Sequence, residues 1–175
     1  MIAIETKNLE LICFTQKHIR SLIQDRTKFV NLMDADVPDD WPNDAYNEVL
    51  PYVLEELEED PQARNWNFMI VEKASNTLIG EIGGKGQPDE KGALEVGYGI
   101  VEDFRNRGFA TEALKALSEW LLQQPEVEKL TAECLEENVA SMRVLSKSGY
   151  VITGTRESDE GKLLLWRYNA NLLQP

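Results

Sequence analysis

Hydrophobic and polar positions follow two periods along the chain, and their order predicts strands alternating with helices. The helical period, with apolar residues at i, i+3, i+4 and i+7, is clearest over residues 110–121. Shorter helical patterns follow Thr15 and Asp44, which we interpret as N-caps, and another spans residues 138–149. Strand-like segments are predicted at residues 2–14, 65–73, 77–84, 93–101, 127–135, 150–157 and 162–168.

This order of elements predicts an α+β fold, in which a mixed sheet of about seven strands is flanked by about four helices. The chain has 175 residues, which is enough for one well-buried domain and short for two. We find no internal repeat and no linker composition along it. A single domain over residues 1–175 is therefore expected.

Charge and composition exclude several classes of partner. Eighteen Lys and Arg against 31 Asp and Glu give a net charge of −13, which argues against nucleic-acid binding. No apolar run approaches the roughly 20 residues of a membrane span, and the first residues do not resemble a signal peptide. Cys13 and Cys134 stand far apart and form no metal-binding pattern. We expect a cytoplasmic protein with reduced thiols, no metal and no membrane partner.

One basic segment stands out in this acidic chain, at the start of the helix predicted over residues 110–121. Its residues are Arg105, Asn106, Arg107, Gly108, Phe109, Ala110 and Thr111. The first amides of a helix lack internal partners, and the helix dipole adds about half a positive charge there. Arginines beside such amides favour phosphate binding, although they could also decorate a surface loop. The segment fits neither a Walker loop nor a dinucleotide fingerprint.

Three segments carry a family resemblance. "RNRGFA" (residues 105–110) resembles the R/Q-x-x-G-x-G/A signature with which GNAT-superfamily acyltransferases hold the pyrophosphate of acetyl-coenzyme A (acetyl-CoA). "EVGYGI" (residues 95–100) and "ENVASMRVLSKSGY" (residues 137–150) are similar to the RimJ/RimL-type branch of N-acetyltransferases. The resemblance implies a mostly antiparallel GNAT-like sheet, splayed between its fourth and fifth strands.

The same resemblance implies the activity. An N-acetyltransferase of RimJ/RimL type would use acetyl-CoA as co-substrate, without a metal. It would acetylate a primary amine, either a protein or peptide N-terminal α-amine or a small amine-bearing molecule. Two alternatives remain at this point: a non-catalytic acyl-CoA-binding or sensing module, and a nucleotide-binding switch using the same helix.

By resemblance, backbone groups near Tyr98 and Ile100 would bond the acetyl carbonyl and the pantetheine arm. Gly97 and Gly99 would then keep the strand clear of side chains, although two strand glycines are also compatible with an ordinary bulge.

Asn138 matches an asparagine that contacts pantetheine in the family, although a plain helix N-cap explains it too. Ser141 would lie near the thiolate, or simply pack against the sheet. Many relatives have a tyrosine where this chain has Leu145, so Ser141, Tyr150 or water is left to protonate the thiolate.

A base is needed because a neutral amine must attack the thioester carbonyl. His18 is the only histidine and belongs to an N-terminal helix, which disfavours histidine schemes. Glu133 is a candidate base that points either into the cleft or to solvent. Glu95 is a candidate base, substrate anchor or structural residue, and Glu157 is a weaker candidate.

Two further features concern partners. Trp41, in an acidic loop, resembles the "W-P" segment that lines the substrate side in similar proteins, or else it anchors the loop to the core. The apolar run at residues 163–166 could supply a homodimer strand.

Overall fold

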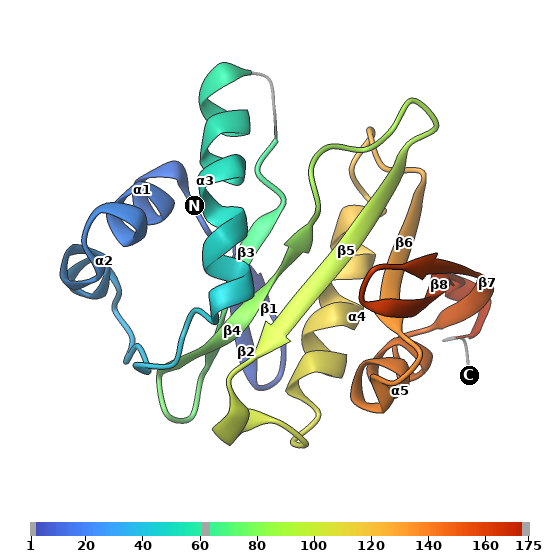
Figure 1. Cartoon of the computed structure of the whole chain (residues 1–175). Helices are drawn as coiled ribbons and strands as arrows, with labels where there is room; N and C mark the ends of the chain where they lie inside the picture. Colours follow the sequence, from blue (N-terminus) through green and yellow to red (C-terminus); the bar gives the residue numbers. More distant parts are fainter. Residues whose placement is uncertain (1–2, 61–63, 173–175) are drawn as a thin grey trace.

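The computed structural model describes residues 3–60 and 64–172, which contain eight strands and five α-helices (Figure 1). The strands are β1 (Ala3–Glu5), β2 (Leu9–Cys13), β3 (Asn67–Glu72), β4 (Thr77–Gly84), β5 (Ala93–Ile100), β6 (Lys129–Leu135), β7 (Tyr150–Ser158) and β8 (Gly161–Tyr168). The helices are α1 (Gln16–Gln24), α2 (Arg26–Leu32), α3 (Asp44–Glu59), α4 (Phe109–Leu121) and α5 (Val139–Lys147), with short 3-10 turns η1 (Glu102–Phe104) and η2 (Ala170–Leu172). The α+β prediction is confirmed, with one strand and one helix more than expected.

The extra strand comes from the N-terminal segment. The predicted strand at residues 2–14, whose first residue lies outside the described part, is a hairpin in which β1 and β2 pair antiparallel. The turn closes because the Thr6 amide and hydroxyl both bond to the Leu9 carbonyl. The polar residues Thr6, Lys7 and Asn8 between the two strands were the available signal for this turn.

The extra helix follows α1. Asp25 ends α1 and caps α2, since its carboxylate accepts a hydrogen bond from the Thr27 amide at 2.9 Å. The cap of α3 is Asn43 rather than Asp44, because the Asn43 side chain accepts from the Tyr46 amide at 2.9 Å. The N-cap prediction for Asp44 was therefore wrong by one residue, while that for Thr15 is confirmed.

The sheet has the order β1-β2-β3-β4-β5-β6-β8-β7, and its neighbours are antiparallel except for β5 and β6. The parallel ladder between β5 and β6 covers only the pairs from Ala93–Lys129 to Glu95–Thr131. Beyond Glu95 the two strands diverge, as Figure 1 shows. This confirms the expected splay between the fourth and fifth strands, since β1 and β2 were counted as one.

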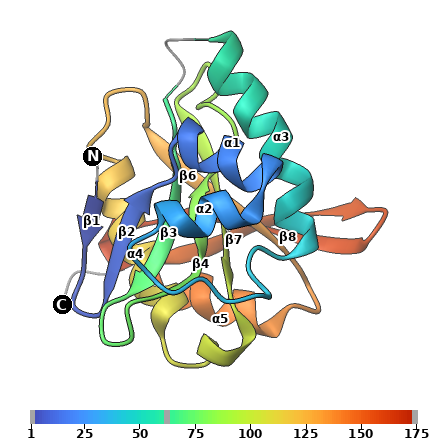
Figure 2. The same cartoon turned by 90° about the vertical axis from the view of Figure 1, so that its left-hand side faces the viewer.

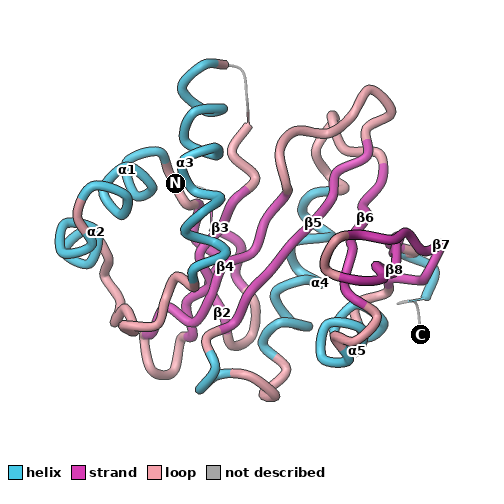
Figure 3. Tube along the Cα trace, in the orientation of Figure 1, coloured by secondary structure: helices cyan, strands magenta, loops and turns pink. Residues whose placement is uncertain are grey.

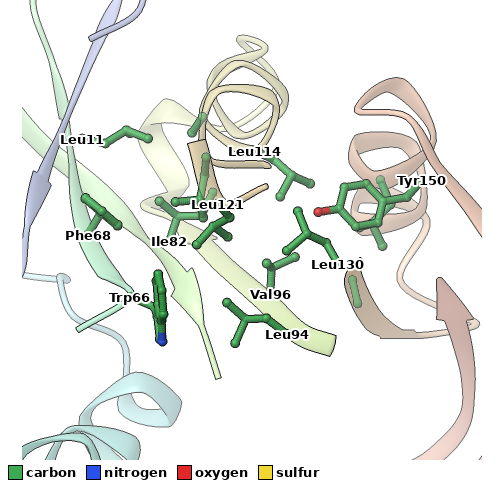
Figure 4. Packing of buried hydrophobic residues seen from close by; sticks show 14 of the residues in the cluster. Leu11, Trp66, Phe68, Ile82, Leu94, Val96, Leu114, Leu121, Leu130 and Tyr150 are labelled. Carbon is green, nitrogen blue, oxygen red and sulfur yellow. The ribbon is translucent and has the colours of Figure 1, made fainter. Parts of the chain in front are cut away.

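Helices cover both faces of the sheet. Figure 2 shows α1, α2 and α3 on one face, where they pack through residues such as Ile19, Phe29 and Leu50. On the other face, α4 and α5 pack over a second cluster that includes Leu114, Leu130 and Tyr150 (Figure 4). The two clusters hold the sheet between the layers and leave the splayed end of β5 beside the first turn of α4.

The amphipathic stripe of α4 fixes the position of its first turn. Ala113, Leu114, Leu117 and Leu121 are buried against the sheet. Full burial of each leucine contributes about 1.5–3 kcal/mol. The fully buried residues begin only at Ala113, so the first turn, which packs against the core through the partly buried Phe109, faces the end of β5 (Figure 1).

Candidate active site

A cleft of about 600 Å³ lies between the end of β5, the first turn of α4 and α5. It brings together most of the residues predicted to bind the coenzyme. They are Tyr98, Ile100, Arg105, Asn106, Gly108, Phe109, Ala110, Thr111 and Asn138, and Ser141 lines the cleft as well. Segments more than 40 residues apart in the sequence thus line the same cleft.

The first turn of α4 presents free backbone donors to this cleft. Gly108 is the N-cap, and its φ of 84° lies in the left-handed region that glycine adopts without strain. No side chain caps the helix, and the amides of residues 109–111 have no acceptor among the described residues. With the helix dipole, these amides form a site suited to an anion.

The two arginines of the basic segment differ in orientation. Arg105 lines the cleft and donates from Nε to the Ile100 carbonyl at 2.8 Å. Arg107 turns back on η1, where it donates to the Asp103 carbonyl at 2.7 Å and lies 5.1 Å from the ring centre of Phe104. Arg105 is thus the arginine of the pair that borders the cleft.

The opposite wall adds positive charge from α5. Arg143 and Lys147 stand one helical turn apart, are exposed and line the cleft. Together with Arg105 they surround the cleft with cations in a chain of net charge −13. The cleft is therefore an electropositive site on an acidic protein.

The open edge of β5 supplies further backbone groups. On the β4 side, the Glu95 carbonyl accepts from the Lys85 amide at 2.8 Å, and the Val101 amide donates to the Ile79 carbonyl at 2.8 Å. Backbone groups alternate between the two edges of a strand, so those of Tyr98 and Ile100 point to the cleft. These groups lie beyond the short ladder with β6.

Two hydroxyl groups meet at the inner end of the cleft. Asn138 caps α5 by accepting from the Ser141 amide at 3.0 Å. The Ser141 hydroxyl lies 2.9 Å from the Tyr98 hydroxyl. Burial raises the pKa of Tyr98 to about 12, so its hydroxyl keeps its proton at neutral pH.

Tyr150, the other tyrosine considered as a proton donor, lies elsewhere. Its side chain is buried in the core, and its hydroxyl is 2.8 Å from the hydroxyl of Ser118, a buried residue of α4. Tyr98, rather than Tyr150, therefore borders the cleft.

Glu95 and Glu133 lie outside the cleft lining, and each has a cationic partner. Lys85 Nζ is 2.5 Å from Glu95 Oε1. Arg156 donates to both oxygens of Glu133, at 3.0 and 2.5 Å. These bonds hold the pKa of Glu133 below its usual range, which makes this carboxylate a weaker proton acceptor.

A carboxylate that the sequence did not single out borders the end of β5 instead. Glu81, on β4, accepts a hydrogen bond from Trp41 Nε1 at 2.6 Å. Both side chains line a recess of about 100 Å³, and Trp41 also packs against Phe14 and Phe29. Burial raises the pKa of Glu81, although the Trp41 bond opposes the rise. The available signal was a single carboxylate in an otherwise apolar and glycine-rich strand.

Other predictions concern the rest of the described chain. Among residues 3–60 and 64–172, no helix is long and apolar enough to span a bilayer, and no cluster of His, Cys, Asp and Glu is arranged to hold a metal. Cys13 and Cys134 are free thiols. In the run proposed for dimerisation, Leu164 and Trp166 are buried in the core, so Leu163 and Leu165 are the half-buried members.

Solved structures share this architecture. The ribosomal-protein-S5-alanine acetyltransferase from Vibrio fischeri superposes with a TM-score of 0.68 over 100% of both chains, at 15% identity. RimL, the ribosomal L7/L12 α-N-protein acetyltransferase in complex with coenzyme A, gives 0.67 over 95% of this chain and 97% of that one, at 18% identity. At these identities the likeness concerns the fold.

Sequence comparison gives the family. The uncharacterized N-acetyltransferase YjdG of Bacillus subtilis is 27% identical over 153 residues, which cover 87% of this chain and 91% of YjdG. Residues 9–151 match the family model described as the acetyltransferase (GNAT) domain. The chain therefore belongs to the GNAT family and is an N-acetyltransferase.

Proposed function

We propose that the protein transfers an acetyl group from acetyl-CoA to a primary amine, as enzymes of RimJ/RimL type do. One observation carries the proposal: the uncapped first turn of α4 and the open edge of β5 border the same electropositive cleft. A diphosphate joined to a long, thin amide-bearing arm matches that combination of an anion site and a strand edge.

Each part of the cleft has a counterpart in acetyl-CoA. The amides of residues 109–111 and the Arg105 side chain would bond the diphosphate, with Arg143 and Lys147 near the outer phosphate groups. The backbone groups of Tyr98 and Ile100 would bond the pantetheine arm as a strand would. Asn138, at the start of α5, would close the other side of the arm.

The chemistry is direct transfer. The amine nitrogen attacks the thioester carbonyl carbon, the carbon–sulfur bond breaks, and the amine proton passes to a base. Coenzyme A leaves as a thiolate, beside which the hydroxyl pair of Ser141 and Tyr98 can donate a proton. An α-amine with a pKa near 8 costs only about 1.4 kcal/mol to deprotonate at pH 7.

Two observations support a protein N-terminal α-amine as the acceptor. Both solved structures are named as acetyltransferases of ribosomal proteins, and the name of RimL specifies an α-amine. A net charge of −13 favours a basic partner such as a ribosomal protein. We propose a cytoplasmic location and give the protein N-terminal α-amine precedence over small amines.

Acetyl-CoA is expected to raise the melting temperature of the protein. At 100 times the dissociation constant the stabilisation is about 2.7 kcal/mol, whereas ATP or GTP at the same concentration should give little. Differential scanning fluorimetry measures this, and release of free thiol with N-terminal peptides, polyamines and aminoglycosides measures turnover. The absence of any shift contradicts the proposal, and a shift without thiol release favours a binding module.

A further inference from the structure

Of the carboxylates that the structure describes, Glu81 alone is buried, with 6% of its surface exposed. Its Oε2 accepts the Trp41 indole N–H at 2.6 Å. None of the described ion pairs includes Glu81, whereas Glu95 and Glu133 each have one. A buried carboxylate with only a neutral donor is electrostatically unsatisfied and attracts a cation.

The second oxygen of Glu81 is directed at β5. An ideal Cβ on Gly99 would lie 2.1 Å from Glu81 Oε1, so this oxygen rests directly above the glycine. It has no hydrogen-bond partner among the described residues. Gly99 thus leaves room for a carboxylate oxygen that is free to accept a proton.

The recess that contains Glu81 adjoins the proposed acetyl-CoA cleft. Ile100 and Arg105 border both spaces, and Gly99 lines the cleft from the strand that Glu81 touches. The loop between α2 and α3, seen in Figure 3, brings Asp40, Trp41 and Asn43 to the recess. Because Gly99 places no side chain between the two spaces, an acceptor held in the recess can extend its amine past β5 to a thioester in the cleft.

We infer that this recess receives the ammonium group of the acceptor and that Glu81 is the base that takes its proton. The inference rests on the proposed function. The ammonium gives one proton to Glu81 Oε1, the nitrogen lone pair forms the new C–N bond, and the carbon–sulfur bond breaks. The nitrogen then loses a second proton, which balances the proton that the departing coenzyme A thiolate takes up. The recess is small, about 100 Å³, so it suits an unhindered primary amine.

Burial is the main influence on the titration of Glu81, and the Trp41 bond opposes it. The charged residues Asp40, Glu102 and Arg105 also line the recess, and Tyr46 faces Glu81 from α3. Burial raises the pKa of Glu81 above the usual glutamate range. Because the base must be ionised, kcat/KM should fall as the pH drops through this raised pKa, and Glu81→Gln should lack that limb.

The test uses the whole protein, acetyl-CoA and n-propylamine as the probe acceptor. Glu81→Gln should lower kcat/KM by ~10²-fold or more and leave the thermal shift with acetyl-CoA intact. Glu10→Gln, a β2 carboxylate outside cleft and recess, is the matched control and should keep wild-type activity. In the complex with coenzyme A, propylammonium chloride should raise the melting temperature of the wild type but not of Glu81→Gln, relative to potassium chloride.

Stability separates a catalytic role from a structural one. Glutamine can still accept the Trp41 bond, and the raised pKa means that ionised Glu81 disfavours folding as the pH rises through it. Glu81→Gln should therefore melt no lower than wild type at pH 8. Wild-type turnover in Glu81→Gln, loss confined to Glu95→Gln or Glu133→Gln, or no propylammonium effect on the wild type overturns the inference. A missing acetyl-CoA shift would instead overturn the proposed function.

Discussion

Gly108→Asp is expected to abolish acetyl-CoA binding, whereas Gly108→Asn should retain much of it. An aspartate places a negative charge at the uncapped first turn of α4, where the amides of residues 109–111 would hold a diphosphate. Loss of charge-assisted bonds and added repulsion predict a ~10²-fold or larger rise in the dissociation constant. Isothermal titration calorimetry with acetyl-CoA measures the difference.

Gly108→Asn is the control variant, because it differs from Gly108→Asp mainly in charge. Asn and Asp have similar size and both tolerate positive φ better than most residues, as Asn106 does at 60°. A Cβ on Gly108 would meet nothing within 4 Å, and the strain of a side chain on this left-handed backbone applies to both variants, so it cancels in the comparison. Equal losses in the two variants would assign the effect to the backbone at Gly108 and contradict an anion site there.

Gly99→Ala is expected to remove most of the activity, whereas Gly97→Ala should remove little of it. The added methyl at Gly99 would lie 2.1 Å from Glu81 Oε1 and displace the carboxylate from the recess. At Gly97 it would meet only the flexible end of Lys85, at 3.0 Å. We expect Gly99→Ala to lower kcat/KM by ~10²-fold, as for loss of a general base, with Gly97→Ala within a few-fold of wild type.

The two alanine variants add the same methyl group to the same face of the same strand, β5. Overpacking at Gly99 should cost about 1–3 kcal/mol of stability, which urea unfolding measures. The acetyl-CoA thermal shift should persist in both variants, because the open edge of β5 is unchanged. Wild-type turnover in Gly99→Ala would show that the position of Glu81 over Gly99 is irrelevant to catalysis.

Local signals made α4 and its first turn predictable. The apolar stripe through Leu114 and Leu117 has the helical period, and Gly108 stands at its start with Arg105 before it. Both features depend on residues within one or two turns of each other. The direction of Arg107 did not follow from them, because its partners Asp103 and Phe104 become neighbours only when η1 forms.

Side-chain contacts between segments far apart in the chain could not be predicted from the sequence. Glu81 becomes distinctive through Trp41, 40 residues earlier in the chain, and through Gly99 on the neighbouring strand. Glu133 was considered as a base on its position alone, but Arg156 on β7 binds it through two hydrogen bonds. Side chains acquire such partners from strand pairing and loop packing, which no local pattern encodes.

A crystal structure of the protein with coenzyme A would show where the diphosphate binds. We predict diphosphate oxygens within hydrogen-bonding distance, about 2.7–3.2 Å, of the amides of residues 109–111, and pantetheine alongside Tyr98 and Ile100. The sulfur should then lie near Ser141, with the thioester carbonyl beside the part of β5 at which Glu81 Oε1 rests above Gly99. A diphosphate bound elsewhere, with the first turn of α4 facing only solvent, would contradict the account.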